Sequence, residues 1–463
     1  MSRGIQRVLV IGLDSATPQF VFGPDRFDLP HLDRLAKAGC WGLLESCHPP
    51  ITVPAWASML TSKDPGTLGI YGFRNRSDRS YGALTTANAK AVRAPRVWDI
   101  LSRAGKKVVV LGVPQTYPPR PVNGWLVSDF LAPDTSVDYT YPKALKQEIE
   151  QAVGGYILDV DDFRTNDKDA LRSRLFALLE NRFATARFLM DTKPWDFFMM
   201  VEMGLDRLHH GFWKYVDPEH PKYVPGNPYA RVFREYYETL DRRIGELLDR
   251  AGEETAVLVV SDHGAKAMVG GVCVNEWLIR EGLLVVKDEL SMVRRIEDCA
   301  IDWSRTTVWS SGGYYARLFF NVAGREPEGV LPPSRYERFR DDLIARIEAM
   351  PGPDSAPLGN RAHKPEELYR SVTGIAPDLL VYFGDLRWRS VGSVGFGSIY
   401  ASENDTGPDD ANHDHYGIFI MDARKGGDGR ELRNLQLMDV APTVLDLFRL
   451  EIPADMQGKV VRR

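Results

Sequence analysis

The hydrophobic pattern of this chain is dominated by four short apolar runs that lead into polar segments. The run at 7–14 reads RVLVIGLD, and similar runs occupy 106–112, 195–202 and 256–262. Continuous stretches of β-branched residues and leucine are typical of strands buried on both faces of a parallel sheet. We therefore predict that these four runs form the central strands.

Amphipathic segments separate the apolar runs. Residues 30–39 carry leucines three positions apart and end in glycine, and 96–105 and 230–252 are also predicted to be helical. This alternation predicts an α/β fold with a mostly parallel central sheet flanked by helices. Such sheets bind ligands beyond the carboxyl ends of their strands, so Asp14, Asp206 and Asp262 are expected to converge.

The remaining segments suggest additions to one large α/β domain that spans 1–463. Residues 114–191 are rich in proline at first and then charged and helical, as in an insertion or cap. Residues 269–405 have glycine clusters and little periodicity, and we expect peripheral strands and loops around the site there. A cap of this kind is a candidate for shaping specificity.

Composition and charge narrow the choice of partners and compartment. The net charge is −5 with no long basic run, which argues against a nucleic-acid polymer as partner. No apolar run is long enough to cross a bilayer, so no membrane partner is expected. The four cysteines form no CxxC pair, and a reducing cytoplasm is the simplest location.

Acidic residues and histidines recur at the ends of the predicted strands. Asp262 and His263 follow one apolar run, and Asp206 and His210 are spaced i, i+4, which is suitable for shared metal binding on a helix. His209 is an alternative ligand one position away. Each of these motifs alone also fits a helix cap or a surface ion pair.

Two further motifs complete a possible metal site. His413 precedes a short apolar run, with His415 as its rival, and Thr52 stands two residues before Pro54. Two divalent ions about 4 Å apart can activate a nucleophile and neutralise charge on a phosphoryl group. The joint occurrence and order of these motifs, rather than any one of them, favour a two-metal centre.

This order of motifs resembles the alkaline phosphatase superfamily, and within it the type I phosphodiesterase/nucleotide pyrophosphatase branch. The similarity is greatest to bacterial and archaeal proteins described as phosphohydrolases or phosphomutases. It extends to the segments 113–133, 206–223 and 312–329, and so covers nearly the whole chain. The resemblance implies an alkaline phosphatase-like core and a metal-dependent phosphoric ester hydrolase.

Carried over by position, the resemblance implies a ligand set and a mechanism. One ion would be bound by Asp14, Thr52, Asp262 and His263, and the other by Asp206, His210 and His413. Thr52 would attack phosphorus and form a phospho-threonine, which water then hydrolyses. The mixed nitrogen and oxygen ligands favour Zn²⁺, with Mn²⁺ as the alternative.

The chain also departs from the family pattern near the nucleophile. Phe73 takes the place of an asparagine that holds a phosphoryl oxygen, with Arg74 and Asn75 beside it as candidate substrate contacts. If Arg74 takes that role, a phosphomonoester with its extra charge becomes more plausible. A small phosphate ester, most simply a diester, is the expected substrate.

Several other functions were weighed against this one. A sulfatase needs a cysteine or serine where Thr52 stands, and a P-loop enzyme needs a GxxxxGK[ST] motif that the sequence lacks. A phosphomutase or phosphomonoesterase would use the same site, and a non-catalytic metal-binding scaffold is the alternative of another class. The sequence does not determine the oligomeric state.

Overall fold

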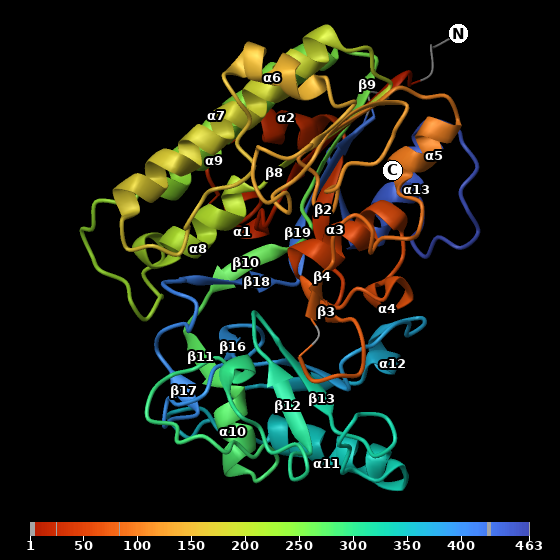
Figure 1. Cartoon of the computed structure of the whole chain (residues 1–463). Helices are drawn as coiled ribbons and strands as arrows, with labels where there is room; N and C mark the ends of the chain where they lie inside the picture. The colour runs from red at the N-terminus through yellow and green to blue at the C-terminus, as the bar shows by residue number, and fades with distance from the viewer. Residues whose placement is uncertain (1–4, 25, 83, 424–426, 463) are drawn as a thin grey trace.

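The predicted apolar runs lie side by side in a nine-stranded sheet, the core of the upper lobe in Figure 1. The computed structural model describes residues 5–24, 26–82, 84–423 and 427–462. The order across the sheet is β20 (Arg430–Gln436), β2 (Cys40–Glu45), β19 (Tyr416–Asp422), β9 (Thr255–Val260), β1 (Arg7–Leu13), β8 (Phe197–Glu202), β5 (Val108–Leu111), β6 (Gly124–Val127) and β7 (Thr140–Tyr141). Most neighbours are parallel, while β19 and β7 run antiparallel to theirs, which confirms the predicted fold class.

Helices cover both faces of this sheet because alternate strand residues point to opposite sides. Leu9 and Ile11 of β1 belong to one buried cluster, and Val8 and Val10 belong to the other. The first cluster includes residues of α1 (Pro18–Val21), α2 (Pro30–Ala38), α6 (Leu145–Val153), α7 (Lys168–Thr192), α8 (Gly204–Val216) and α9 (Val232–Ala251). The second includes residues of α3 (Thr52–Thr61), α5 (Val97–Arg103), η3 (Leu437–Asp439) and α13 (Val440–Leu447), with α4 (Pro65–Leu68) following α3.

A second lobe lies below the sheet in Figure 1 and is built from residues 269–405 around its own apolar cluster. One of its sheets has the order β12 (Val308–Ser311), β13 (Ala316–Phe320), β15 (Leu379–Tyr382), β14 (Arg361–His363), and the other β16 (Trp388–Val391), β11 (Gly270–Cys273), β17 (Tyr400–Ala401). Its helices are α10 (Val274–Arg280), η1 (Ile296–Asp298), η2 (Pro333–Arg335), α11 (Tyr336–Glu348) and α12 (Pro365–Leu368).

Two short ribbons lie where the lobes meet. One pairs β10 (Gly264–Ala267) with β18 (Ala411–Asp414), and the other pairs β3 (Arg74–Arg76) with β4 (Leu84–Thr86). The segment 114–191 supplies β6 and β7 to the central sheet and α6 and α7 to the helical layer on one face. Among the described residues, no helix combines the length and apolar character needed to cross a bilayer.

Candidate active site

Three neighbouring strands of the central sheet deliver the three predicted aspartates to one place. Strands β9, β1 and β8 are adjacent and parallel, so their carboxyl ends meet at the same edge. Asp14 directly follows β1, Asp262 follows β9 by two residues, and Asp206 lies in the first turn of α8 after β8. All three side chains are buried, as expected for charges that bind a cation or an ion-pair partner.

Asp14 is fixed by a residue from the opposite helical layer. The indole Nε1 of Trp56, on α3, donates a hydrogen bond to Asp14 Oδ2 at 2.7 Å. Gly12 makes this approach possible, because a Cβ there would lie 2.5 Å from the Trp56 ring. The other oxygen, Asp14 Oδ1, is buried and has no hydrogen-bond partner in the described part of the chain.

The carboxylate of Asp262 also has only one of its two oxygens held by a hydrogen bond. Ser15 adopts a left-handed conformation with φ of 66°, and its backbone N–H donates to Asp262 Oδ1 at 3.1 Å. Asp262 Oδ2 has no hydrogen-bond partner and lies 3.1 Å from His263 Nε2. A residue in a sparsely populated conformation beside buried carboxylates is typical of a functional site.

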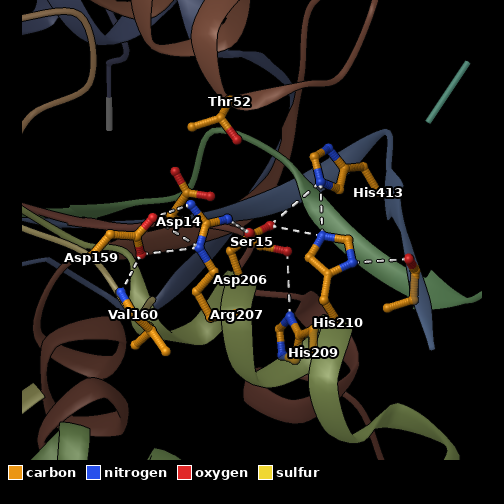
Figure 2. A network of polar contacts seen from close by, with 12 residues as sticks. Asp14, Ser15, Thr52, Asp159, Val160, Asp206, Arg207, His209, His210 and His413 are labelled. Atoms are coloured by element: carbon orange, nitrogen blue, oxygen red, sulfur yellow. Dashed lines mark hydrogen bonds and ion pairs between the residues drawn. The ribbon is translucent and has the colours of Figure 1, made fainter. Parts of the chain in front are cut away.

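Asp206 and His210 lie one turn apart on the same face of α8, as their spacing predicts (Figure 2). Arg207 donates from Nη1 to Asp206 Oδ2 at 2.6 Å. Asp206 Oδ1 lacks a hydrogen-bond partner, although it lies 3.3 Å from His210 Nε2 and 3.4 Å from His413 Nε2. Each of the three aspartates therefore has one oxygen held by the protein and one left free.

The three histidines are oriented by acceptors at Nδ1. His210 Nδ1 lies 2.7 Å from Asp409 Oδ1. The acceptors of the other two rings are backbone carbonyl oxygens: that of Pro50 lies 2.9 Å from His413 Nδ1, and that of Gly264 lies 3.0 Å from His263 Nδ1. Nδ1–H donation in these contacts directs Nε2 of each ring toward the cluster, where loss of any Nε2 proton would leave a lone pair for a metal ion. This is the usual arrangement of metal-binding histidines and their outer partners.

The free donor atoms form two groups. Asp14, Asp262 and His263 have ligand atoms within 4.8 Å of one another, and the same holds for Asp206, His210 and His413. Thr52 Oγ1 lies 3.4 Å from His263 Nε2, next to the first group. Buried carboxylate oxygens without donors, facing imidazole Nε2 atoms, fit two divalent cations, and the mixed oxygen and nitrogen set suits Zn²⁺ or Mn²⁺.

The electrostatics of the metal-free cluster reflect this crowding of acids. Burial, followed by the charge of Asp206, raises the pKa of Asp14 well above its usual value. Burial, followed by Asp14, does the same to the pKa of Asp262. Burial also lowers the pKa of both His263 and His413, which favours their neutral, metal-binding form. Bound cations would displace protons from the carboxyls and relieve this repulsion.

Thr52 is the first residue of α3, where backbone N–H groups are free of helical partners (Figure 2). Its side chain is buried, yet it lines a cavity of about 500 Å³. The positive end of the helix dipole stabilises negative charge at this position. A hydroxyl so placed, beside a predicted cation site, is suited to attack an anionic phosphoryl group.

The cavity is lined by residues of both lobes. Of the two predicted substrate contacts, Arg74 lines the cavity and Asn75 is not among its lining residues. Phe73 and Arg74 line it together with Asp206 and His413. The Asn75 side chain instead braces the loop before it, because its Oδ1 accepts from the Tyr71 N–H at 2.7 Å and its Nδ2 donates to a neighbouring carbonyl.

The two rival histidines lie outside both ligand groups. The ring of His209 contacts Ser15 Oγ and the Tyr237 hydroxyl. His415 packs near His48, with ring centroids 5.5 Å apart. The structure thus brings His210 and His413 together, while metal binding itself stays a prediction.

Sequence reasoning missed the residues that orient the ligands. Trp56 and Asp409 carry no motif of their own, since each acts through a contact between segments far apart in sequence. The same holds for Tyr314, whose ring stacks on His210 with centroids 4.9 Å apart. Trp56 lies four residues after Thr52, and nothing in the sequence around it indicates that its indole contacts Asp14.

Comparison with known proteins agrees with this geometry. The family model described as type I phosphodiesterase / nucleotide pyrophosphatase matches residues 8–409. Among curated protein sequences, none matches this chain.

Solved structures with the same fold include human ectonucleotide pyrophosphatase / phosphodiesterase 5, with a TM-score of 0.55, 14% identity, and coverage of 98% of this chain and 97% of that chain. They also include phosphonoacetate hydrolase from Sinorhizobium meliloti 1021 in complex with phosphonoformate, with a TM-score of 0.57, 17% identity, and coverage of 95% and 94%. Structural similarity at such low sequence identity establishes the fold alone. The family is established by the family model, which matches most of the sequence. The chain therefore belongs to the type I phosphodiesterase / nucleotide pyrophosphatase family, and it is a phosphoric ester hydrolase.

Proposed function

We propose that this protein is a two-metal phosphodiesterase that acts on a small phosphate ester through a phospho-threonine at Thr52. The observation that carries the proposal is the convergence of two groups of free donor atoms beside Thr52. One ion would be held by Asp14, Thr52, Asp262 and His263, and the other by Asp206, His210 and His413. These ions, Zn²⁺ or Mn²⁺, would neutralise phosphoryl charge and lower the pKa of the attacking hydroxyl.

The chain's own groups account for the rest of the reaction. Thr52 Oγ forms a bond to phosphorus as the bond to the leaving-group oxygen breaks, and the hydroxyl proton is released. The N-terminus of α3 stabilises the negative charge on the phosphoryl oxygens. Water then cleaves the phospho-threonine, which yields a monoester and restores Thr52.

A diester is favoured by the family and by the room around Thr52. A diester carries groups on both sides of phosphorus, and the cavity of about 500 Å³ lies open between the lobes. The position of Arg74 on its wall supports a second candidate, monoester hydrolysis or phosphoryl transfer, because a monoester brings an extra charge that an arginine would neutralise. In the described part of the chain, the thiols of Cys47, Cys273 and Cys299 form no disulfide, which fits a cytoplasmic location.

The test is metal-dependent hydrolysis of bis(p-nitrophenyl) phosphate compared with p-nitrophenyl phosphate. After chelation, activity should return with Zn²⁺ or Mn²⁺, and Thr52→Ala should lower kcat by about 10⁴-fold or more. Thr61→Ala, at the other end of the same helix, is the matched control and should stay active.

Other results of this assay would support a different function. A preference for the monoester would favour a phosphatase or mutase. Full activity of Thr52→Ala would remove the proposed nucleophile. A protein that binds two ions but cleaves neither ester would be a mutase awaiting its acceptor or a non-catalytic scaffold.

A further inference from the structure

The wall of the active-site cavity carries more positive charge than the proposed two-metal chemistry requires. Three acidic side chains, Asp206, Glu297 and Asp405, line the cavity. They are outnumbered by the arginines in its wall, which are Arg74, Arg164, Arg207, Arg295, Arg317 and Arg389. An anionic substrate is attracted to such a wall, so the question is which guanidinium groups are free to bind it.

Several of these arginines already have carboxylate partners. Arg164 and Arg389 share the buried carboxylate of Asp409, at 3.0 and 3.1 Å. Arg207 pairs with Asp159 at 2.6 Å. These groups support the predicted metal-binding residues from outside, and each of them already has a carboxylate partner within the protein.

Arg317 differs because it is buried and has no such partner. Its side chain donates from Nη2 to Ser311 Oγ at 2.9 Å and from Nη1 to the backbone carbonyl of Arg74. Within the part of the chain that the structure describes, neither Arg317 nor Arg74 forms a salt bridge. Arg317 as a whole is only 8% exposed, and a buried guanidinium group without a counter-ion is costly unless a ligand supplies one.

The position of Arg317 is fixed by the lower lobe. It lies on β13, in register with Ser311 at the end of β12, and the turn between them contains Gly312 and Gly313. On the other side the loop at Gly72 passes closely, since a Cβ there would lie 3.2 Å from Arg317 Nη1. The guanidinium is thus held rigidly in the cavity wall, in the lobe opposite Thr52.

We propose that Arg317, with Arg74 beside it, binds a second anionic group of the substrate, separated from the phosphate that Thr52 attacks. The substrate is then a phosphodiester with a carboxylate or an additional phosphate on one of its two organic groups. A guanidinium has five N–H donors, of which the contacts with Ser311 and the Arg74 carbonyl use two, and its planar fork recognises either anion. This inference rests on the proposed phosphodiesterase function and adds the class of substrate.

Three p-nitrophenyl diesters test the idea, carrying an ethyl group, a 2-carboxyethyl group or a 2-phosphonoethyl group. The wild-type enzyme should cleave at least one charged diester with kcat/KM at least about 10-fold above that of the ethyl diester. Arg317→Lys should reduce this preference, and Arg317→Met should abolish it. The variant Arg74→Gln, which changes an exposed side chain, should weaken it without disturbing the fold.

A matched control separates a specific contact from general attraction. Arg295→Gln removes the same charge from the cavity wall, but Arg295 lies 3.6 Å from Glu297, and the preference should survive its loss. An equal loss in Arg295→Gln and Arg317→Met would overturn the assignment, because bulk charge would then explain it. Equal rates for all three diesters in the wild type would also overturn it while leaving the phosphodiesterase proposal intact.

Binding without turnover keeps this test independent of the reaction. Calorimetry of the metal-loaded protein would compare 2-carboxyethylphosphonate with propylphosphonate, which differ in the added carboxylate. We expect at least about 10-fold tighter binding of the carboxylate compound, lost in Arg317→Met and reduced in Arg74→Gln. Equal affinities would refute the second anion site even if no diester is hydrolysed.

Discussion

The two lobes place their functional groups on different kinds of support. In the upper lobe, Asp14, Asp206 and Asp262 lie at the ends of three adjacent parallel strands, and each carboxylate has one oxygen held and one free. In the lower lobe, Arg317 lies on a small antiparallel sheet and has hydrogen bonds but no carboxylate partner among the described residues. The upper lobe thus offers negative charge for cations, and the lower lobe offers positive charge for an anion.

This difference suggests that the two lobes have separate functions. Changes in the upper lobe should act on metal binding and on the rate of the chemical step. Changes in the lower lobe should act on the choice of substrate. The predictions below test this division.

After the loss of Thr52 itself, the largest effect is expected for His413, which completes the second candidate ligand group from β18. His413→Ala should lower kcat/KM by about 10³-fold, on the order of 4 kcal/mol of transition-state stabilisation, because a ligand facing Asp206 and His210 is lost. The matched control is His415→Ala, two residues away and outside both groups, which should retain activity. The reverse result would assign the ligand role to His415.

A smaller effect is expected for Asp409, which orients His210 through Nδ1. Asp409→Asn should weaken binding of the second metal ion by about 10- to 100-fold, because the imidazole loses its anionic partner. Calorimetric titration with Zn²⁺ measures this change. Unchanged affinity would mean that packing against Tyr314 alone positions the ring.

The raised pKa values of Asp14 and Asp262 predict how pH affects the metal-free protein. Folded carboxyls that hold their protons above the unfolded pKa make the folded state bind more protons. Stability is therefore full below that unfolded pKa and falls as pH rises toward the folded value, by up to about 1.4 kcal/mol per pH unit for each carboxyl.

Bound metal ions replace the protons on Asp14 and Asp262. The metal-bound protein should therefore not lose stability as pH rises. The difference in unfolding midpoint between loaded and metal-free protein should widen as pH rises from about 5 to about 8. Thermal unfolding across this range measures it, with Asp262→Asn as the variant in which the widening shrinks. A constant difference would contradict the predicted competition between protons and metal.

The smallest effect is expected at the boundary between the lobes. Asn75→Ala removes two hydrogen bonds within one loop and should lower the free energy of unfolding by about 1 kcal/mol with little change in kcat. Urea unfolding and steady-state rates measure the two quantities. A large fall in kcat would instead support the direct substrate contact that the sequence suggests.

The central sheet was predictable because its strands are buried on both faces. Short runs rich in β-branched residues, such as VLVIG in β1, are typical of such strands, and the strand-end position of Asp14 followed from them. The candidate ligand residues could be named from the order of their motifs along the chain, and the shared helix face of Asp206 and His210 followed from their i, i+4 spacing. The proximity of the three aspartates followed from the parallel topology.

The contacts between distant segments were not predictable in this way. Asp409 reaches His210 from 199 positions along the chain, and Trp56 reaches Asp14 from another layer of the fold. The buried state of Arg317 depends on two short strands in a region of weak periodicity. Such residues acquire their roles only through tertiary packing.

The convergent donor atoms are predicted to hold two divalent ions, and the metal content of the purified protein decides whether they do. Mass spectrometry of protein dialysed against Zn²⁺ or Mn²⁺ should find two ions per chain, one for each ligand group. The variant His210→Gln should retain only the ion of the Asp14 group, while His209→Gln, its neighbour outside both groups, should retain two. A wild-type protein that binds fewer than two ions, or a His210→Gln variant that still binds both, would contradict the account.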